Sequence, residues 1–228
     1  MSSSPHHIGI IMDGNRRWAK AQGRPTMEGH RQGYEKVKEV TKWCIQKEVK
    51  ILSIFAFSTE NWKRTEEEIG YLMNLLEMFV RSDLKDLHEK NIRVRIIGKR
   101  DRLRPSILEA LDEAERTTEH NTGLTLGICF NYGGRQEIVD ACKKIIEQGI
   151  PADQLTEQTI TSHLYWPDMP EPDLIIRTSG EERMSGFLLW ECAYSELYWC
   201  QSHWPAFSEQ DFDTALATYA ERQRRYGA

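Results

Sequence analysis

Short apolar segments alternate with longer helical patterns along this chain of 228 residues. Five segments are rich in β-branched residues and lie at 8–12, 51–57, 94–97, 124–130 and 174–176, with a sixth expected at 197–199. This alternation is typical of βαβ units, in which parallel strands form one sheet and the helices between them cover both faces. We therefore predict an α/β fold with a mainly parallel central sheet of about six strands flanked by helices.

Length and charge restrict the class of protein. A chain of this length fits a single domain, which we expect to span residues 1–228. No apolar run approaches the roughly 20 residues that cross a bilayer, and the start MSSSPHH lacks the features of a secretory signal, so we expect a cytoplasmic protein. The net charge of −5 argues against nucleic acid as a partner, although a local basic pocket can still attract an anionic ligand.

The clearest helix signal follows Thr65. Thr65 and Glu68 form a capping box ahead of a long helix that reaches about Lys90. Apolar residues between 69 and 87 recur at three and four positions and give one broad apolar face, which ordinary core packing would explain. Two further helices are expected, one from Pro105 to about Glu119 and a strongly charged one from 208 to 225.

Polar segments follow four of the predicted strands. They lie at 13–17, 58–62, 131–135 and 177–183. Each alone could be an ordinary turn, but the carboxyl ends of parallel strands meet at one edge of a sheet, where ligands bind. Several of these residues are arginines beside carboxylates, and the guanidinium group matches phosphate oxygens two at a time. The chain has no GxxxxGK[ST] or GxGxxG motif, so a polyanion site other than these nucleotide-binding loops is predicted.

Several motifs resemble one known family. The segments MDGNRRWA, FAFSTENWKR, NYGGR, IRTSGE, RMSGFLLW and YSELYW occur in the order found in cis-prenyltransferases, and the bacterial undecaprenyl diphosphate synthases are the best match. The resemblance implies Mg²⁺-dependent, sequential addition of isopentenyl diphosphate to an allylic diphosphate, usually farnesyl diphosphate. It also implies a long-chain product such as undecaprenyl diphosphate, held in a hydrophobic product channel for which the 69–87 stripe is a natural wall.

The resemblance assigns catalytic roles to Asp13 and Asn61 and a metal site to Asp13 and Glu196. Asp13 resembles the aspartate that holds Mg²⁺ and handles diphosphate ionisation, and Glu196 resembles a second metal ligand. Asn61 matches the position usually assigned as proton acceptor. A carboxamide is a poor base, so Asn61 could instead orient the substrate while a phosphate oxygen or Asp13 takes the proton.

The resemblance also implies two diphosphate sites. Asn15, Arg16, Arg17 and His30 resemble the allylic-diphosphate cradle, and Arg177, Arg183 and Ser185 resemble the isopentenyl diphosphate site. The complete set of expected substrate-binding residues is Gly14, Asn15, Arg16, Arg17, Trp18, Thr26, His30, Ser58, Thr59, Glu60, Trp62, Arg64, Arg177, Arg183, Met184 and Ser185. Without the resemblance, His30 could be a satisfied histidine at a helix start, and Trp18 and Trp62 could be core aromatic residues.

Three positions depart from the family pattern. Thr26 stands where many relatives have arginine, with Arg24 as a candidate replacement from a shifted position. Gly186 stands in place of an asparagine that is common in undecaprenyl synthases. Phe130 is bulkier than the residue often found in that strand, which would shorten the channel. Gly186 occurs in some shorter-product relatives, so a shorter-product cis-prenyltransferase is the alternative.

Two rival classes explain fewer residues. A non-catalytic subunit of the same fold would typically lack the Asp-Gly-Asn segment that this chain keeps, and a lipid carrier would explain the apolar stripe but not the arginines. The family implies a homodimer, for which the aromatic segment 194–204 is a candidate interface. Peripheral membrane contact is compatible with release of an apolar product.

Overall fold

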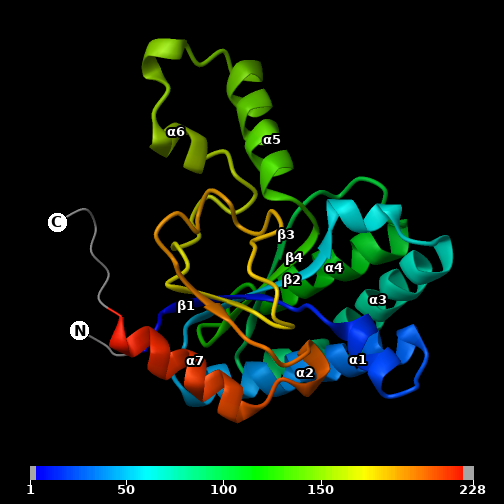
Figure 1. The fold of residues 1–228 in the computed structure, drawn as a ribbon. Coiled ribbons are helices and arrows are strands. Elements are labelled where there is room, and N and C mark those ends of the chain that lie inside the picture. Colours follow the sequence, from blue (N-terminus) through cyan, green and yellow to red (C-terminus); the bar gives the residue numbers. More distant parts are fainter. Residues whose placement is uncertain (1–3, 223–228) are drawn as a thin grey trace.

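The computed structural model describes residues 4–222, and its centre is one six-stranded sheet. The strands are β1 (His7–Ile11), β2 (Ile51–Ser58), β3 (Arg93–Ile97), β4 (Thr125–Tyr132), β5 (Leu174–Arg177) and β6 (Glu196–Trp199). Their order across the sheet is β3-β4-β2-β1-β5-β6, and every neighbouring pair is parallel (Figure 1). The predicted α/β fold with about six parallel strands is confirmed.

The strands differ from the predicted segments by only one or two residues at their ends. β1 begins at His7, whose buried ring hydrogen-bonds through Nδ1 to the Pro170 carbonyl oxygen at 2.6 Å and through Nε2 to the Ser53 hydroxyl at 2.8 Å. β4 continues to Tyr132, whose buried hydroxyl donates a hydrogen bond to Glu137. In both strands a polar residue occupies a buried position because its hydrogen bonds are satisfied, which an apolar pattern does not reveal.

The described residues form seven α-helices. They are α1 (Asn15–Ala21), α2 (Thr26–Gln46), α3 (Glu66–Glu89), α4 (Pro105–Thr118), α5 (Gly134–Glu147), α6 (Glu157–Thr161) and α7 (Glu209–Glu221). α7 follows Ser208, whose hydroxyl accepts a hydrogen bond from the Asp211 backbone N–H at 3.1 Å. The expected end of this helix at 225 lies outside the described residues.

The starts of α3 and α4 agree with their sequence signals. The Thr65 hydroxyl accepts a hydrogen bond from the Glu68 backbone N–H at 3.3 Å, and Pro105 is the first residue of α4. The reciprocal half of the predicted capping box does not form, because the Glu68 carboxylate binds His30 and Arg64 instead. The capping motif therefore predicts the start of α3 correctly, but it does not predict the contacts of the Glu68 side chain.

One face of the sheet is covered by helices. Buried residues of α2, α3, α4 and α7, including Val40, Val80, Leu111 and Phe212, form one hydrophobic cluster with strand residues such as Ile54. Figure 1 shows α2, α3 and α7 running along this side of the sheet. The amphipathic patterns seen in the sequence thus serve the core on this face.

The opposite face differs from the helical cover expected there. Its hydrophobic cluster joins strand residues to the irregular segments 165–169 and 184–192 of the described chain. Phe187 lies so close to β1 that a Cβ atom on Gly9 would come within 2.9 Å of its ring and within 2.5 Å of the Ile175 side chain. A glycine in the middle of β1 therefore allows the 184–192 segment to lie directly on the sheet.

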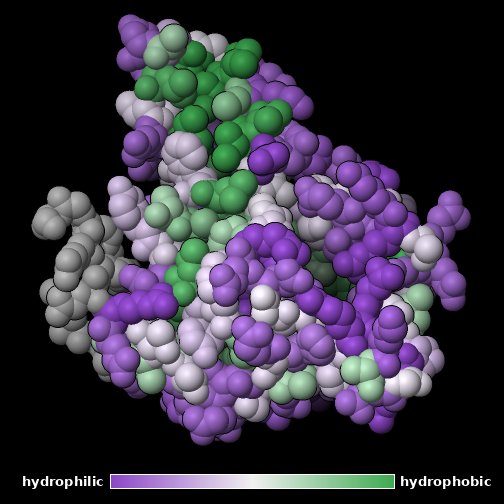
Figure 2. All heavy atoms as spheres, in the orientation of Figure 1, coloured by the Kyte–Doolittle hydropathy of each residue, from purple (hydrophilic) through white to green (hydrophobic). Residues whose placement is uncertain are grey.

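The chain between β4 and β5 forms an arm that projects from the sheet. α5 and α6 build this arm (Figure 1), and its exposed apolar residues include Val139, Ile146 and Leu155. Figure 2 shows apolar side chains gathered on the arm in green. Within residues 4–222, no helix has the length and apolarity required to cross a membrane.

Two neighbouring carboxylates, Glu137 of α5 and Glu191 of the 184–192 segment, are buried. Glu137 accepts hydrogen bonds from the Tyr132 hydroxyl and the Tyr165 backbone N–H, whereas both Glu191 carboxylate oxygens are buried without a hydrogen-bond partner. Burial, followed by the nearby Glu137 charge, raises the pKa of Glu191 to about 8, and burial also raises the pKa of Glu137. An unpaired buried carboxylate is favoured in its neutral form.

We expect the stability of this protein to fall as the pH rises from about 5 to about 9, because folding then has to bury a charged Glu191. The folded-state pKa lies above the ordinary value, so its stabilising contribution is complete below pH 4.5 and is lost as the pH passes about 8. Glu191→Gln should flatten this profile and be more stable than the parent at high pH, as measured by urea unfolding. The exposed Glu182→Gln is the control, and equal slopes for both variants would contradict the assignment.

Candidate functional site

The four polar segments lie at the carboxyl ends of four adjacent strands. β4, β2, β1 and β5 are neighbours in the sheet, so the segments that follow them share one edge (Figure 1). The convergence expected from the order of elements along the chain is therefore present in the structure.

Asp13 is the central carboxylate of this edge. Its Oδ2 accepts a hydrogen bond from Arg177 Nη2 at 2.8 Å, and its Oδ1 lies 3.1 Å from Arg17 Nη2. Partial burial raises the pKa of Asp13, but the hydrogen bonds and charges of Arg177 and Arg17 outweigh it and hold the pKa below its ordinary value. Its backbone oxygen also accepts hydrogen bonds from the Thr178 hydroxyl and the Trp204 N–H. Asp13 is thus a fixed, ionised group at neutral pH.

Arg177 connects Asp13 to the segment after β5. Its side chain is only 4% exposed, and its Nη1 donates hydrogen bonds to the Arg183 carbonyl oxygen and, at 2.8 Å, to Ser185 Oγ. Ser185 has a left-handed backbone with φ 50°, and Gly186 follows with φ 83°. One guanidinium group therefore fixes both the carboxylate and the loop that carries the other predicted residues.

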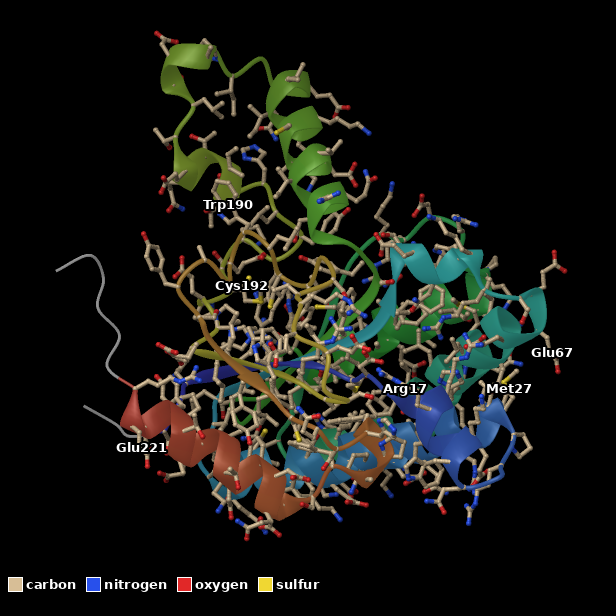
Figure 3. All side chains as sticks on the ribbon, viewed as in Figure 1. Arg17, Met27, Glu67, Trp190, Cys192 and Glu221 are labelled. Atoms are coloured by element: carbon tan, nitrogen blue, oxygen red, sulfur yellow. The ribbon has the colours of Figure 1, made fainter. Side chains whose placement is uncertain are left out.

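Glu181 joins two arginines at the surface of the site. Its Oε1 accepts a hydrogen bond from Arg17 Nη1 at 2.9 Å, and its Oε2 accepts one from Arg183 Nη1. Figure 3 labels Arg17 beside α1, the first helix of the chain. Sequence reasoning included Glu181 in a motif but gave it no role, and the bridge depends on segments 164 residues apart.

The turn between β1 and α1 requires a glycine. Gly14 has φ 103°, and a Cβ atom there would lie 2.6 Å from Ser179 Oγ and 2.9 Å from His203 Nδ1. Asn15 follows as the first residue of α1, and its Oδ1 is buried without a hydrogen-bond partner. The tight turn therefore delivers Asn15, Arg16 and Arg17 to the site together.

Glu68 holds a cluster of cationic and titratable groups. Its Oε1 lies 3.0 Å from His30 Nε2 and accepts a hydrogen bond from Arg64 Nη1 at 2.9 Å, and its Oε2 lies 3.9 Å from Arg16 Nη1. Burial lowers the pKa of His30 despite the opposing effect of Glu68. The capping pattern predicts only a role at the helix start for Glu68, and its contacts with His30, Arg64 and Arg16 are seen only in the structure.

A cavity of about 440 Å³ opens between these groups and the apolar face of α3. Its polar lining is Asp13, Gly14, Asn15, Arg16, Arg17, His30, Asn61 and Arg64. Its apolar lining includes Val37 from α2, Leu72, Leu76 and Phe79 from α3, and Phe130 from β4. The cavity thus combines a charged end with an apolar end, as a ligand with an anionic head and an apolar tail would require.

The segment after β2 contributes Asn61 and Arg64 to the cavity. Asn61 Oδ1 accepts a hydrogen bond from the Ser58 backbone N–H at 3.1 Å, which fixes the carboxamide at the start of the short 3₁₀ helix Thr59–Lys63. Trp62 packs against Phe57 with ring centroids 5.1 Å apart and does not appear among the cavity-lining residues.

The other predicted substrate-binding residues do not line the cavity. This group consists of Trp18, Thr26, Ser58, Thr59, Glu60, Trp62, Arg177, Arg183, Met184 and Ser185. Trp18 packs under Arg24, whose guanidinium carbon lies 5.6 Å from the ring centroid, and Met184 packs against the second hydrophobic cluster. The residues after β5 still join the site, because Arg177 reaches Asp13.

Glu196 lies at the opposite edge of the sheet from Asp13. It is the first residue of β6, in register with Leu174, and its carboxylate accepts a hydrogen bond from Arg222 Nη1 at 2.9 Å. The expectation that Asp13 and Glu196 of one chain hold a metal ion together does not fit this register. Within residues 4–222, no group of three or more His, Cys, Asp or Glu side chains is arranged to hold a metal.

The chain is similar to proteins that transfer prenyl groups. It matches the prenyltransferase family model of undecaprenyl diphosphate synthases over residues 11–227. It is 50% identical to the isoprenyl transferase of Agrobacterium fabrum, an alignment that covers 100% of this chain and 94% of that protein. It is 46% identical to the isoprenyl transferase of Thermotoga maritima, with 98% and 97% covered.

Two solved structures share the fold over the full length. Lavandulyl diphosphate synthase from Lavandula x intermedia, crystallised with dimethylallyl diphosphate, has a TM-score of 0.93 and 36% identity, with 99% of each chain covered. A probable undecaprenyl diphosphate synthase from Campylobacter jejuni has a TM-score of 0.84 and 31% identity, with 100% of each chain covered.

The position of Glu68 leads to a prediction about stability. Glu68→Gln should lower the free energy of unfolding by about 1–3 kcal/mol, because it leaves the half-buried Arg64 without its carboxylate partner. The neighbouring Glu67 is exposed, so Glu67→Gln is a matched control and should unfold like the parent. Equal urea midpoints for the two variants would show that Glu68 does not support this cluster.

Proposed function

Because the chain belongs to the prenyltransferase family of undecaprenyl diphosphate synthases, we propose that it condenses isopentenyl diphosphate with an allylic diphosphate to extend a cis-prenyl chain. The observation that carries this proposal is the position of Asp13. It lies between Arg17 and Arg177 at the charged end of a cavity whose other end is apolar. A substrate with a diphosphate head and an isoprenoid tail has the same two parts.

The two diphosphates are assigned to the two sides of Asp13. The allylic diphosphate would bind at Asn15, Arg16, Arg17 and His30, because these residues line the cavity that would receive its tail. Isopentenyl diphosphate would bind at the loop held by Arg177, with Arg183 and Ser185 as its ligands. Bidentate guanidinium groups suit both sites.

Asp13 can bind Mg²⁺ if substrate phosphate oxygens supply further ligands. This ion prefers oxygen ligands and usually combines one or two carboxylates with substrate phosphate oxygens. Asp13 supplies an ionised carboxylate, and the buried Asn15 Oδ1 is an acceptor without a protein partner. When bound, the ion would neutralise charge on the leaving diphosphate. Glu196 of the same chain is not assigned to it, because it lies at the other edge of the sheet.

The chemistry breaks one bond and forms another. The allylic carbon–oxygen bond breaks, diphosphate leaves, and the terminal carbon of the isopentenyl group bonds to the allylic carbon. This leaves a cation on C3 of the isopentenyl group, and loss of a proton from C2 forms the new double bond between C2 and C3. Arg16 and Arg17 would stabilise the leaving diphosphate, while the apolar lining excludes water from the allylic cation.

A diphosphate oxygen, rather than Asn61 or Asp13, would accept the proton that is lost. Asn61 is uncharged, and its oxygen already accepts the Ser58 hydrogen bond. The two arginines lower the pKa of Asp13, which makes it a weak base. Asn61 would then orient the isopentenyl group.

The cavity of about 440 Å³ is large enough for a short allylic primer. If benzene occupies a cavity of about 150 Å³, each carbon needs about 25 Å³, so 440 Å³ accommodates roughly 18 carbons. An undecaprenyl chain of about 55 carbons would need roughly 1,400 Å³. The dimethylallyl diphosphate in the lavandulyl diphosphate synthase structure agrees with a short allylic primer. Farnesyl diphosphate, the primer implied by the sequence, would almost fill the space.

The proposal is tested with purified protein, labelled isopentenyl diphosphate, Mg²⁺ and dimethylallyl, geranyl or farnesyl diphosphate. Organic-extractable label is the expected result, and its absence with every primer would favour a non-catalytic subunit or a lipid carrier. A homodimer, a cytoplasmic location and transient membrane contact stay predictions of the same proposal.

Asp13→Ala is expected to lower kcat by roughly 1,000-fold or more, because it removes a charge that acts as the leaving group develops. Single-turnover measurements give the rate of the chemical step in Asp13→Ala, and a melting curve shows whether the variant is folded. The exposed Asp168→Ala is the control. Near-parental turnover in Asp13→Ala would remove Asp13 from the reaction.

Arg183→Lys is expected to raise the KM for isopentenyl diphosphate by about tenfold while the KM for the allylic primer changes little, because a point charge replaces a bidentate group. The Arg183 side chain is 60% exposed, so the fold should be unaffected. Steady-state kinetics with each substrate varied in turn provide the measurement. A rise confined to the allylic KM would mean that the two sites are assigned in reverse.

A further inference from the structure

Of the four polar segments at the sheet edge, 131–135 is the one to which the proposed reaction gives no role. It begins with Asn131, which is 2% exposed and has a left-handed backbone with φ 49°. Asparagine adopts this conformation more readily than most residues other than glycine. The preceding residue, Phe130, lines the cavity, whereas Asn131 does not. Asn131 is therefore a buried polar residue next to the cavity wall whose contacts need an explanation.

Both ends of the Asn131 carboxamide are hydrogen-bonded. Oδ1 accepts a hydrogen bond from Trp62 Nε1 at 2.7 Å. Nδ2 donates to the Lys99 carbonyl oxygen at 3.1 Å, to the Asp101 carbonyl oxygen at 3.0 Å and to Asp101 Oδ1 at 3.1 Å. An indole N–H can only donate and a carbonyl oxygen can only accept, so these partners decide which way the carboxamide faces. Asn131 thus joins Trp62 to the turn at 99–101.

The indole of Trp62 is held by three contacts. Besides the hydrogen bond to Asn131, its ring meets the Phe57 ring at an angle of 73° with centroids 5.1 Å apart. The Arg102 guanidinium carbon lies 4.2 Å from the centroid of the indole. The ring contacts define the plane of the indole, and the directional hydrogen bond to Nε1 fixes its rotation within that plane.

The turn that contains Trp62 presents Asn61 to the cavity. Both residues belong to the 3₁₀ helix Thr59–Lys63, and Asn61 lines the cavity. The hydrogen bond from the Ser58 N–H to Asn61 is local, so it fixes the carboxamide relative to its own turn. The hydrogen bond from Trp62 to Asn131 joins positions 69 residues apart. This second bond therefore fixes the turn relative to β4.

The segment after β4 touches the same turn at a second point. A Cβ atom on Gly133 would lie 2.5 Å from Thr59 Oγ1, so the backbone approaches the 3₁₀ helix closely here. Thr59 is the first residue of that helix and Trp62 is the fourth. The contacts of Gly133 and Asn131 therefore lie on either side of Asn61 along the chain.

We propose that Asn131 is a positioning residue: through the indole of Trp62 it holds Asn61 where Asn61 orients the isopentenyl group for loss of one particular C2 hydrogen. This inference rests on the proposed function. As the allylic carbon bonds to C4, the electrons of one C2–H bond form the double bond to C3, and the proton passes to a diphosphate oxygen. The two C2 hydrogens differ only in the direction in which they point. Selective loss of one of them therefore requires a fixed orientation of the isopentenyl group.

Two variants remove the hydrogen bond from opposite sides. Asn131→Gly removes the side chain and tolerates the left-handed backbone, whereas Trp62→Phe removes the N–H and keeps an aromatic ring. Each should lower kcat by about tenfold or more while the KM for the allylic primer stays within about twofold, because misplacement costs rate rather than primer binding. The double variant should be no slower than the slower single variant, because both changes break one hydrogen bond.

Isopentenyl diphosphate with deuterium in one or the other C2 position gives a readout that is independent of the amount of folded protein. Deuterium in the product is counted by mass spectrometry. The parent should lose deuterium from one sample and keep it in the other. Asn131→Gly and Trp62→Phe should each lose part of the deuterium from both samples. A purely structural role would lower the yield of product and leave this selectivity at the parental value.

Asn91→Gly is the matched control. Asn91 also has a left-handed backbone, with φ 58°, and its carboxamide is also bonded at both ends. It accepts a hydrogen bond from the Thr122 N–H at 2.9 Å and donates one to Thr122 Oγ1 at 3.1 Å. Asn91 precedes β3 at the amino edge of the sheet and does not line the cavity. This variant should keep the parental kcat and the parental deuterium selectivity.

The outcomes separate this inference from the proposed function. If Asn131→Gly fails to fold, Trp62→Phe carries the test. Folded variants with parental selectivity, or an equal loss of selectivity in Asn91→Gly, would overturn the positioning role while the reaction stands. If the parent forms no product from any primer, the proposed function and this inference are both wrong.

Discussion

The hydrogen bond between Asp13 and Arg177 fixes the arrangement of the site. It joins the ends of the adjacent strands β1 and β5 at 2.8 Å. The same guanidinium group holds the loop that contains Arg183 and Ser185, and the Asp13 backbone accepts hydrogen bonds from Thr178 and Trp204. The side chains of this ion pair and the Asp13 backbone therefore hold four separate segments together. Because Arg177 is buried, removing its carboxylate partner would lower the stability of the fold.

The fold was predictable because its signals are local and repeated. Short β-branched runs alternating with helical patterns predicted the six strands to within one or two residues, and Thr65 and Pro105 marked two helix starts. The parallel order also explained why the polar segments meet. What the sequence could not give was the destination of long side chains, such as Glu68, which leaves its own helix end to bind His30 and Arg64.

Other differences have the same origin in contacts between distant segments. Glu196 looked like a partner of Asp13 because both lie in matching motifs, but the register of β6 against β5 places it at the amino edge. Irregular chain rather than a helix covers much of the second face, because Gly9 lets Phe187 approach β1. The hydrogen bond from the Tyr34 hydroxyl to Asp83 joins α2 to α3, and these two residues are 49 positions apart and form no motif. Strand register, close approach of the backbone and hydrogen bonds between helices depend on residues far apart in the sequence, so local patterns do not predict them.

The carboxylates of Glu68 and Glu181 give the site an additional property. Each already binds arginines or histidine at the positions that we assign to diphosphate groups. An arriving polyanion therefore exchanges with resident counterions instead of neutralising bare cations, which moderates both its affinity and the dependence of that affinity on salt. When diphosphate departs, the same carboxylates would be free to pair with these groups again. Glu68 and Glu181 would thus compete with a bound diphosphate for the same cationic groups.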